Sequence, residues 1–150
     1  MNPSAQEVLK SCVQNLEELV APELTSPHAK SAMMCARMLI NHVILRLDGE
    51  GEALAADCRE KRALLAQLAQ EGTLDADCAA QVAAMLEAPE PEHTSIATLT
   101  ARDDAWKRLT ERVLAGLGDG EPRARIRRQL AAQISRENAC CGPAMDGPMF

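Results

Sequence analysis

Apolar residues recur along this chain at intervals of three and four, and this spacing constrains its fold more than any other feature. An α-helix turns once in about 3.6 residues, so the spacing gathers apolar side chains on one face of a helix. Val, Ile and aromatic residues do not form the alternating runs typical of strands, and the chain has one Trp, one Phe and no Tyr. Alanine, leucine and methionine favour helix instead. The sequence therefore predicts an all-α fold.

Capping and breaking residues divide the apolar pattern into six expected helices. The first begins at the sequence SAQE, residues 4–7, which is a capping box, and it ends at Pro22. The second begins at Ser26, a natural N-cap, with Pro27 in the first helical position. It should end near Leu47, before the sequence DGEG. The remaining helices are expected over residues 52–70, about 73–86, about 98–117 and 122–138.

The chain length and the short connections predict how these helices assemble. A chain of 150 residues can form one domain with a real core, but it is too short for two ordinary domains. Helices joined by short loops pack antiparallel. We therefore expect, over residues 1–138, an antiparallel bundle of about four helices plus a C-terminal helix pair. The acidic, proline-containing segment 88–93 should link the two parts, and residues 139–150 should form a flexible tail rich in Cys, Gly and Pro.

Charge and hydropathy argue against several classes of protein. A net charge of −6 and the scarcity of aromatic residues disfavour a nucleic-acid-binding protein. The longest apolar run, residues 38–47, contains Asn41, His42 and Arg46, so no membrane span is predicted. No segment resembles an export signal. The six cysteines, which include Cys140 and Cys141 in the tail, are therefore expected to be free thiols in a reducing cytoplasm.

The expected second helix has apolar residues on two flanks. The face predicted to point to the core contains Ala32, Ala36, Leu39, Ile40, Val43, Ile44 and Leu47. The other flank contains His28, Ser31, Cys35, Met38, His42 and Arg46, with Met34 and Leu45 beside them. A helix that is apolar on two sides is usually covered on both. We therefore predict an interface on the second flank, formed by Met34, Cys35, Met38, His42 and Arg46, and we expect Leu39→Ala to cost about 2–5 kcal/mol as a core truncation.

The second flank admits two sharper interpretations. Cys35, Met38 and His42 are spaced so that their side chains converge, and a soft metal ion binds thiolate, thioether and imidazole groups. The paired ligands of typical metal sites are missing, however, so no metal site is predicted. His28 and His42 lie about 21 Å apart along a straight helix, and no nucleophile is placed beside either. No catalytic residue is predicted, and these two histidines are the candidates if the protein is an enzyme.

The N-terminal third of the chain carries a short motif. A helix is followed by Pro22 and Leu24, and then by the sequence SPHAKSA, residues 26–32, which opens an apolar helix. In this motif the chain resembles a group of small, uncharacterised bacterial all-helical proteins encoded beside aminoglycoside-phosphotransferase-like kinases and acyl-CoA dehydrogenases. The resemblance implies an accessory or partner role near acyl-CoA or hydroxy-acid metabolism. It implies no activity and no catalytic residue.

These observations favour a non-catalytic helical protein that acts through contact. We expect a homodimer, or a small subunit of a larger metabolic enzyme complex, with no cofactor. The alternative is a small-molecule-binding bundle or a small helical enzyme. Its cavity would be lined by His28, Cys35, Met38, His42 and Arg46, with Arg46 binding an anionic group and a histidine acting as acid or base.

Overall fold

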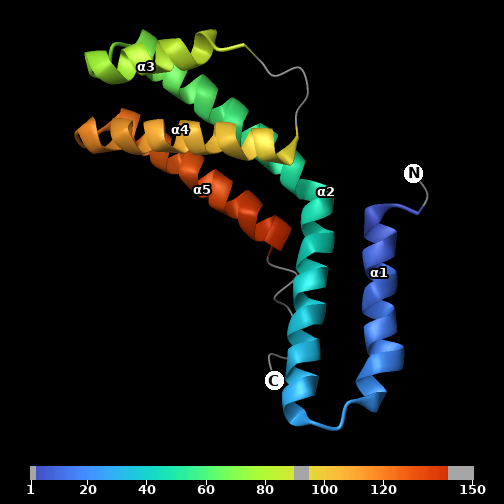
Figure 1. Cartoon of the computed structure of the whole chain (residues 1–150). Coiled ribbons are helices and arrows are strands. Elements are labelled where there is room, and N and C mark those ends of the chain that lie inside the picture. Colours follow the sequence, from blue (N-terminus) through green and yellow to red (C-terminus); the bar gives the residue numbers. More distant parts are fainter. Residues whose placement is uncertain (1–2, 90–94, 142–150) are drawn as a thin grey trace. The chain divides into compact units, whose positions relative to one another are not determined.

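The computed structural model describes residues 3–89 and 95–141, and this part of the chain is built from helices (Figure 1). A π-helical turn over Leu16–Val20 and a 3₁₀ turn over Ala21–Glu23 connect the first two α-helices. The described residues contain no strand, so the prediction of an all-α fold is confirmed. The α-helices are α1 (Ala5–Asn15), α2 (Pro27–Gln70), α3 (Ala76–Glu87), α4 (Ile96–Gly116) and α5 (Glu121–Cys141).

The predicted N-caps of the first two helices are confirmed. The Ser4 hydroxyl accepts a hydrogen bond from the Glu7 amide at 3.2 Å, and the Glu7 carboxylate accepts one from the Ser4 amide at 2.7 Å. The Ser4 amide, and then the Ser4 hydroxyl, donate to the Glu7 carboxylate, and these two hydrogen bonds lower the pKa of Glu7. The Ser26 hydroxyl accepts from the amide of Ala29 at 3.4 Å. Local capping chemistry therefore determines where the first two helices begin.

The caps of α3 and α4 lie close to the predicted positions but on different residues. The Asp75 carboxylate caps α3 by accepting from the Cys78 amide at 2.7 Å, whereas the sequence placed the start at Thr73. The Ser95 hydroxyl caps α4 by accepting from the Thr98 amide at 3.1 Å. Asp and Ser are better N-caps than Thr, which explains both shifts.

Helix α2 does not break at the sequence DGEG, so the prediction of two helices over residues 26–70 is wrong. α2 runs without interruption from Pro27 to Gln70. Glycine inside a helix costs only about 1 kcal/mol, and no proline removes a backbone N–H here, so a long helix tolerates this segment. The helix ends at Gln70, as predicted, and Gly72, which follows it, has a φ of 68°. There the Gly72 amide donates to the Ala69 carbonyl and the Thr73 amide donates to the Leu68 carbonyl, as in a Schellman motif.

The two glycines Gly51 and Gly72 should respond to alanine in opposite directions. No heavy atom lies within 4 Å of a Cβ added at either position, so backbone conformation alone determines the outcome. Gly51→Ala should raise the free energy of unfolding by about 0.5–1 kcal/mol because position 51 is helical. Gly72→Ala should lower it by about 1–2 kcal/mol because of the left-handed backbone. Urea denaturation followed by the emission of Trp106 measures both, and a shift in the same direction for both variants would contradict the assignment.

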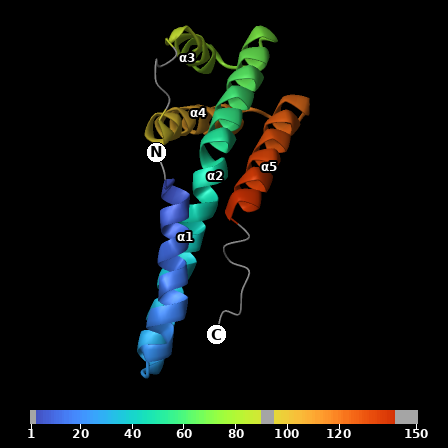
Figure 2. The ribbon, with the colours of Figure 1, turned by 90° about the vertical axis from the view of Figure 1, so that its right-hand side faces the viewer.

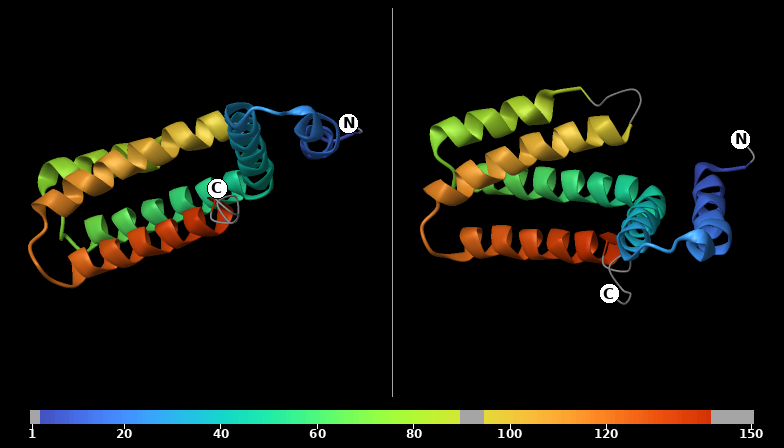
Figure 3. Two further views of the ribbon diagram at one scale, coloured as in Figure 1. Left: turned by 90° about the horizontal axis from the view of Figure 1, so that it is seen from below. Right: turned by 60° about the horizontal axis from the view of Figure 1, so that its bottom comes forward.

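Gly51–Arg136 form one compact unit, a bundle of four helical segments. Figure 3 shows the second half of α2, α3, α4 and α5 side by side. Helices α4 and α5, which the sequence predicted as an added pair, thus contribute directly to the core of this unit. The buried core comes from all four segments and consists of Cys58, Leu65, Leu68, Cys78, Val82, Trp106, Leu109, Val113 and Ile126.

The remaining described residues, 3–50 and 137–141, belong to a second unit. Within it α1 lies antiparallel beside the first half of α2 (Figure 2), and we refer to residues 5–50 as the α1–α2 hairpin. Polar contacts join its two helices. Gln6 donates to the Asp48 carboxylate at 2.6 Å, and Arg37 and Glu17 form an ion pair at 2.8 Å. Ile44 is the single buried residue among the described residues of this unit.

The predicted linker and tail fall largely outside the described residues. Ala88 and Pro89 follow α3, whereas the rest of segment 88–93 lies outside the description. α5 continues through Cys141, so the first three residues of the predicted tail are helical, and residues 142–150 are not described. The chain divides into two compact units, and the single domain over residues 1–138 stays a prediction.

Candidate functional site

An apolar stripe runs along the first half of α2. It consists of Leu39, Val43 and Leu47, whose exposed fractions are 67%, 46% and 46%. Residues four apart lie on one face of a helix. Asp48 accepts from Gln6 of α1, and Arg37 pairs with Glu17 of the π-helical turn. At about 100° per residue, Arg37 and Asp48 lie roughly 120–140° around the helix from Val43. The α2 stripe is therefore directed away from α1.

This stripe belongs to the face that the sequence assigned to the core, and for these three residues the assignment is wrong. Periodicity identifies an apolar face, but it does not tell which face a neighbouring helix covers. Gln6 of α1 donates a hydrogen bond to the Ile44 carbonyl, and Glu17, in the turn after α1, forms an ion pair with Arg37. The side of α2 that carries Arg37 and Ile44 is therefore the side that α1 and this turn contact. Leu39 is exposed, so Leu39→Ala leaves no core cavity, and the expected loss of 2–5 kcal/mol does not apply.

Of the residues predicted to form an interface, Cys35, His42 and Arg46 lie within about 100° of Val43 around the helix, whereas Met34 and Met38 lie about 140–180° from it. Cys35 and Arg46 are exposed, and Arg46 forms an ion pair with Glu50 one turn later. Met34, Met38 and His42 are half-buried, and His28 is exposed in the first turn of α2. The two pockets described in this structure are lined by other residues. Whether the predicted set forms an interface or lines a site therefore stays a prediction.

The rest of the α1–α2 hairpin is also poorly covered. α1 contains no buried residue. Val8, Leu19 and Val20 are exposed in α1 and the turn that follows it. Together with the α2 stripe they make six of the eight large hydrophobic residues that are exposed in the described chain. The hairpin thus carries most of the large exposed hydrophobic residues in the described part of the chain.

The bundle contains a buried ionic pair that sequence reasoning missed. The Lys61 ammonium, on α2, donates to the Asp103 carboxylate, on α4, at 2.5 Å, and both side chains are fully buried. Lys107 contacts the second carboxylate oxygen of Asp103 at 2.9 Å. A signal for this pair was present, because Asp103 lies four residues after Leu99 and three before Trp106, on the apolar face of α4.

A second charged group joins α2 to α5. Arg136 forms ion pairs with Asp57 and Glu60, and its Nη1 lies 2.9 Å from a carboxylate oxygen of Glu60. Glu60 and Asp57, in that order, raise the pKa of Arg136. One arginine that approaches from α5 therefore donates charge-assisted hydrogen bonds to both carboxylates.

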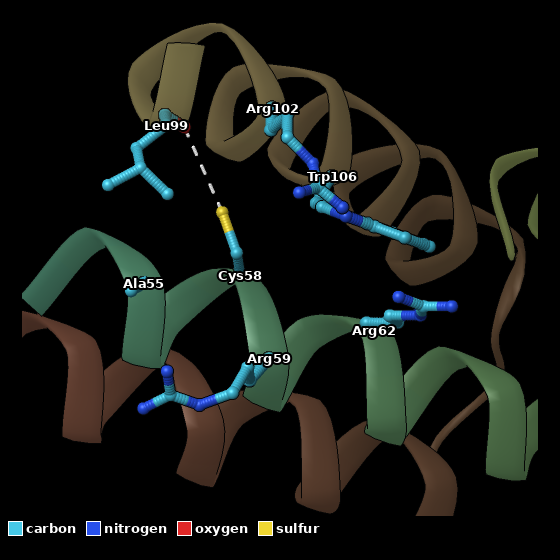
Figure 4. A pocket seen from close by; sticks show the side chains of 7 residues that line it. All are labelled: Ala55, Cys58, Arg59, Arg62, Leu99, Arg102 and Trp106. Atoms are coloured by element: carbon cyan, nitrogen blue, oxygen red, sulfur yellow. Dashed lines mark hydrogen bonds between the residues drawn. The ribbon is translucent and has the colours of Figure 1, made fainter. Parts of the chain in front are cut away.

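A pocket of about 380 Å³ opens between α2 and α4 (Figure 4). The described residues that line it include three arginines and several apolar side chains, namely Ala55, Cys58, Arg59, Arg62, Leu99, Arg102 and Trp106. The Cys58 thiol donates to the Leu99 carbonyl at 3.8 Å. Burial, and then the nearby Asp103 carboxylate, raise the pKa of Cys58. A neutral thiol is a poor nucleophile, so the pocket is suited to binding rather than to covalent chemistry.

Three further observations concern the cysteines, metal binding and membrane spans. Cys12 and Cys35 are exposed free thiols, and Cys58 and Cys78 are buried free thiols. Within residues 3–89 and 95–141, no group of three or more His, Cys, Asp or Glu side chains is arranged to bind a metal ion. No helix in these ranges has the length and hydropathy needed to cross a membrane.

The resemblance carried by Pro22, Leu24 and residues 26–32 stays a prediction, because no relative is found that would test it. Neither a protein-family model nor a curated protein nor a solved structure matches this chain.

Proposed function

We propose that this protein acts through association, and that the α2 stripe is the surface on which a second copy of the chain docks. The observation that carries the proposal is the exposure of Leu39, Val43 and Leu47 on a helix face directed away from α1. Soluble proteins rarely leave contiguous apolar patches uncovered unless the patch contacts another molecule. A non-catalytic, contact-based role in the cytoplasm is consistent with this surface.

The energetics of the α1–α2 hairpin support the proposal. Two helices of this length gain most of their stability from packing of an apolar face. Here the described part of the unit buries one residue, Ile44, and leaves six large hydrophobic residues exposed. Docking a second hairpin on the α2 stripe would produce a four-helix arrangement in which the three stripe side chains, Leu39, Val43 and Leu47, are covered. Association would therefore supply the burial that the hairpin lacks.

The order of residues in the stripe favours a second copy over an unrelated partner. Leu39 and Leu47 each lie four residues from Val43, one on either side. In an antiparallel pair centred on Val43, the Leu39 of each copy would meet the Leu47 of the other copy. A two-fold interface must be self-complementary in this way. Cys35 and Arg46, two of the predicted interface residues, would lie at its edge.

The double substitution Leu39→Glu and Leu47→Glu tests the proposal. The native chain should have the mass of a dimer in analytical ultracentrifugation, and the double variant should have the mass of one chain. Burying a leucine contributes about 1.5–3 kcal/mol, and the pair of copies buries four, so dissociation should be favoured at least about a hundredfold. Circular dichroism should show that helical content is retained.

A matched control and an orientation test accompany this experiment. Ile134→Glu changes a residue of α5 that is 57% exposed in the bundle unit, and it should leave the dimer intact. Val43→Cys, in a chain whose other exposed cysteines are serine, should form a disulfide-linked dimer on oxidation because the two copies of residue 43 meet on the axis. A single-chain mass for the native protein, or a dimer that survives the double substitution, would sink the proposal. A stoichiometric complex with a larger enzyme subunit alone would identify a different partner and also contradict self-association.

A further inference from the structure

We infer that α5 is a detachable helix of the bundle, which leaves as one piece while the other three helical segments of the Gly51–Arg136 unit stay folded. The inference concerns residues 121–136 of α5. It is independent of self-association, because every observation that supports it lies within the bundle unit. Detachment would uncover the apolar core residues against which Ile126 and Leu130 pack. α5 would thus act as a cover over part of this core.

α5 contributes little to the apolar core. Ile126 is the single buried apolar residue among residues 121–136, and Leu130, one turn later, packs against the core but is only partly buried. Burial of an apolar face supplies most of the stability of a docked helix. The buried apolar residues of α4, by comparison, are Leu99, Trp106, Leu109 and Val113. α5 is therefore held in the bundle more weakly than α4.

A buried amide on α5 opposes docking. Gln129 is 9% exposed, and among the described residues neither its Nε2 nor its Oε1 atom has a hydrogen-bond partner. A polar group that leaves water without gaining a hydrogen bond destabilises the buried state. Water can bind both atoms once α5 has left the bundle. The Gln129 amide therefore favours the detached state.

The contact between α4 and α5 is incompletely filled. A pocket of about 290 Å³ lies between them, and its described lining includes Leu114 on α4 and Leu130 and Ile134 on α5. Side chains that face an open pocket lack the dispersion contacts that a close-packed neighbour would give. The separation of α5 from α4 therefore breaks fewer contacts than the separation of two closely packed helices.

Ion pairs join α5 to α2 near the two ends of residues 121–136. Arg125 donates to Glu71 at 3.0 Å, and Arg136 donates to Asp57 at 2.8 Å. Arg125 and Glu71 are 20% and 37% exposed, and ion pairs that water reaches contribute little to stability. When α5 leaves, the separated charges regain water. These pairs therefore orient α5 on α2 but hold it only weakly.

Native-state hydrogen exchange measures the opening of each helix. Amides of residues 121–136 should exchange through an opening at least about tenfold more populated than the opening that exposes amides near Leu65 and Leu109. Leu99→Ala is the control, because Leu99 is buried in the wall of a pocket whose described lining comes from α2 and α4. This variant should speed exchange in α2 and α4 at least about tenfold. It should leave exchange in α5 unchanged, because the docked and detached states lose the same contact.

Two substitutions at position 129 test the cause of detachment. Gln129→Leu keeps a similar helix propensity and removes the unpaired amide, so it should slow exchange in α5 about tenfold. Gln129→Glu has nearly the same shape and buries a charge, so it should speed this exchange at least about tenfold. Three results would overturn the inference. They are equal exchange in α5 and α4, faster exchange in α5 caused by Leu99→Ala, and exchange in α5 that Gln129→Leu does not slow.

Discussion

Replacing Asp103 by alanine should lower the free energy of unfolding of the bundle by about 3–5 kcal/mol. The carboxylate accepts from the Lys61 ammonium at 2.5 Å, and both groups are fully buried. Removing it leaves a positive charge in the core with no compensating partner, and this costs far more than the intact pair contributes. Urea denaturation followed by Trp106 emission measures the change, since Trp106 is buried in the same core.

Two control variants separate the buried charge from other effects. The double substitution Lys61→Met and Asp103→Leu removes both charges and should recover most of the lost stability, because apolar residues of similar volume often replace a buried ion pair without loss. Lys107→Ala removes the second, 38% exposed partner of the same carboxylate and should cost about 1 kcal/mol or less. If the double variant is as unstable as Asp103→Ala, the loss comes from packing rather than from an unpaired charge.

Ile126→Ala should destabilise the bundle by about 2–5 kcal/mol, whereas Ile134→Ala should cost less than about 1 kcal/mol. The two residues have the same side chain on the same helix, α5, but Ile126 is 0% exposed and Ile134 is 57% exposed. Truncating Ile126 removes buried apolar surface and leaves a cavity among residues that include Val82 and Trp106. Truncating Ile134 removes atoms that remain in contact with water. Thermal and urea denaturation of the two variants, prepared in parallel, measure this difference.

The comparison also tests which helices form the core. The sequence placed the four-helix bundle before the acidic segment 88–93, with residues 122–138 as part of an added pair. In that arrangement Ile126 would contribute little to the main core, and the two alanine variants would be similarly mild. Similar losses for both would therefore argue for the predicted arrangement and against the one described above.

Much of the fold follows from local chemistry that the sequence displays. Ser4 and Ser26 cap the first two helices with their hydroxyl groups, as the sequence predicts. Gly72 follows the end of α2 and adopts the left-handed backbone that glycine tolerates. The continuity of α2 does not follow so directly, because glycine raises the cost of a helix without forbidding it. Residues 48–51 remain helical because the segments on both sides are strong helix formers. The free energy of the whole helix therefore decides whether these four residues are helical, and their own propensities do not.

The candidate surfaces are less predictable because they depend on which faces of the helices pack against one another. The pattern of residues 32–47 identified an apolar face of α2 correctly, but it could not show that α1 contacts the side with Arg37. The pocket was missed for a similar reason. Arg62 and Arg102 are 40 residues apart in the chain, and only the packing of α4 on α2 brings them to one space. Asp103 was predictable in principle, since a charged residue within an apolar face needs a buried partner.

The division between a bundle with a complete core and a hairpin with one buried residue has a consequence for how the protein responds to its own abundance. A core within one chain gives the same stability at any dilution, whereas burial that a second copy supplies follows mass action. Scarce chains would keep a folded bundle while their hairpins frayed, and abundant chains would have both parts ordered. The amount of protein in a cell would then set how much of each molecule is structured.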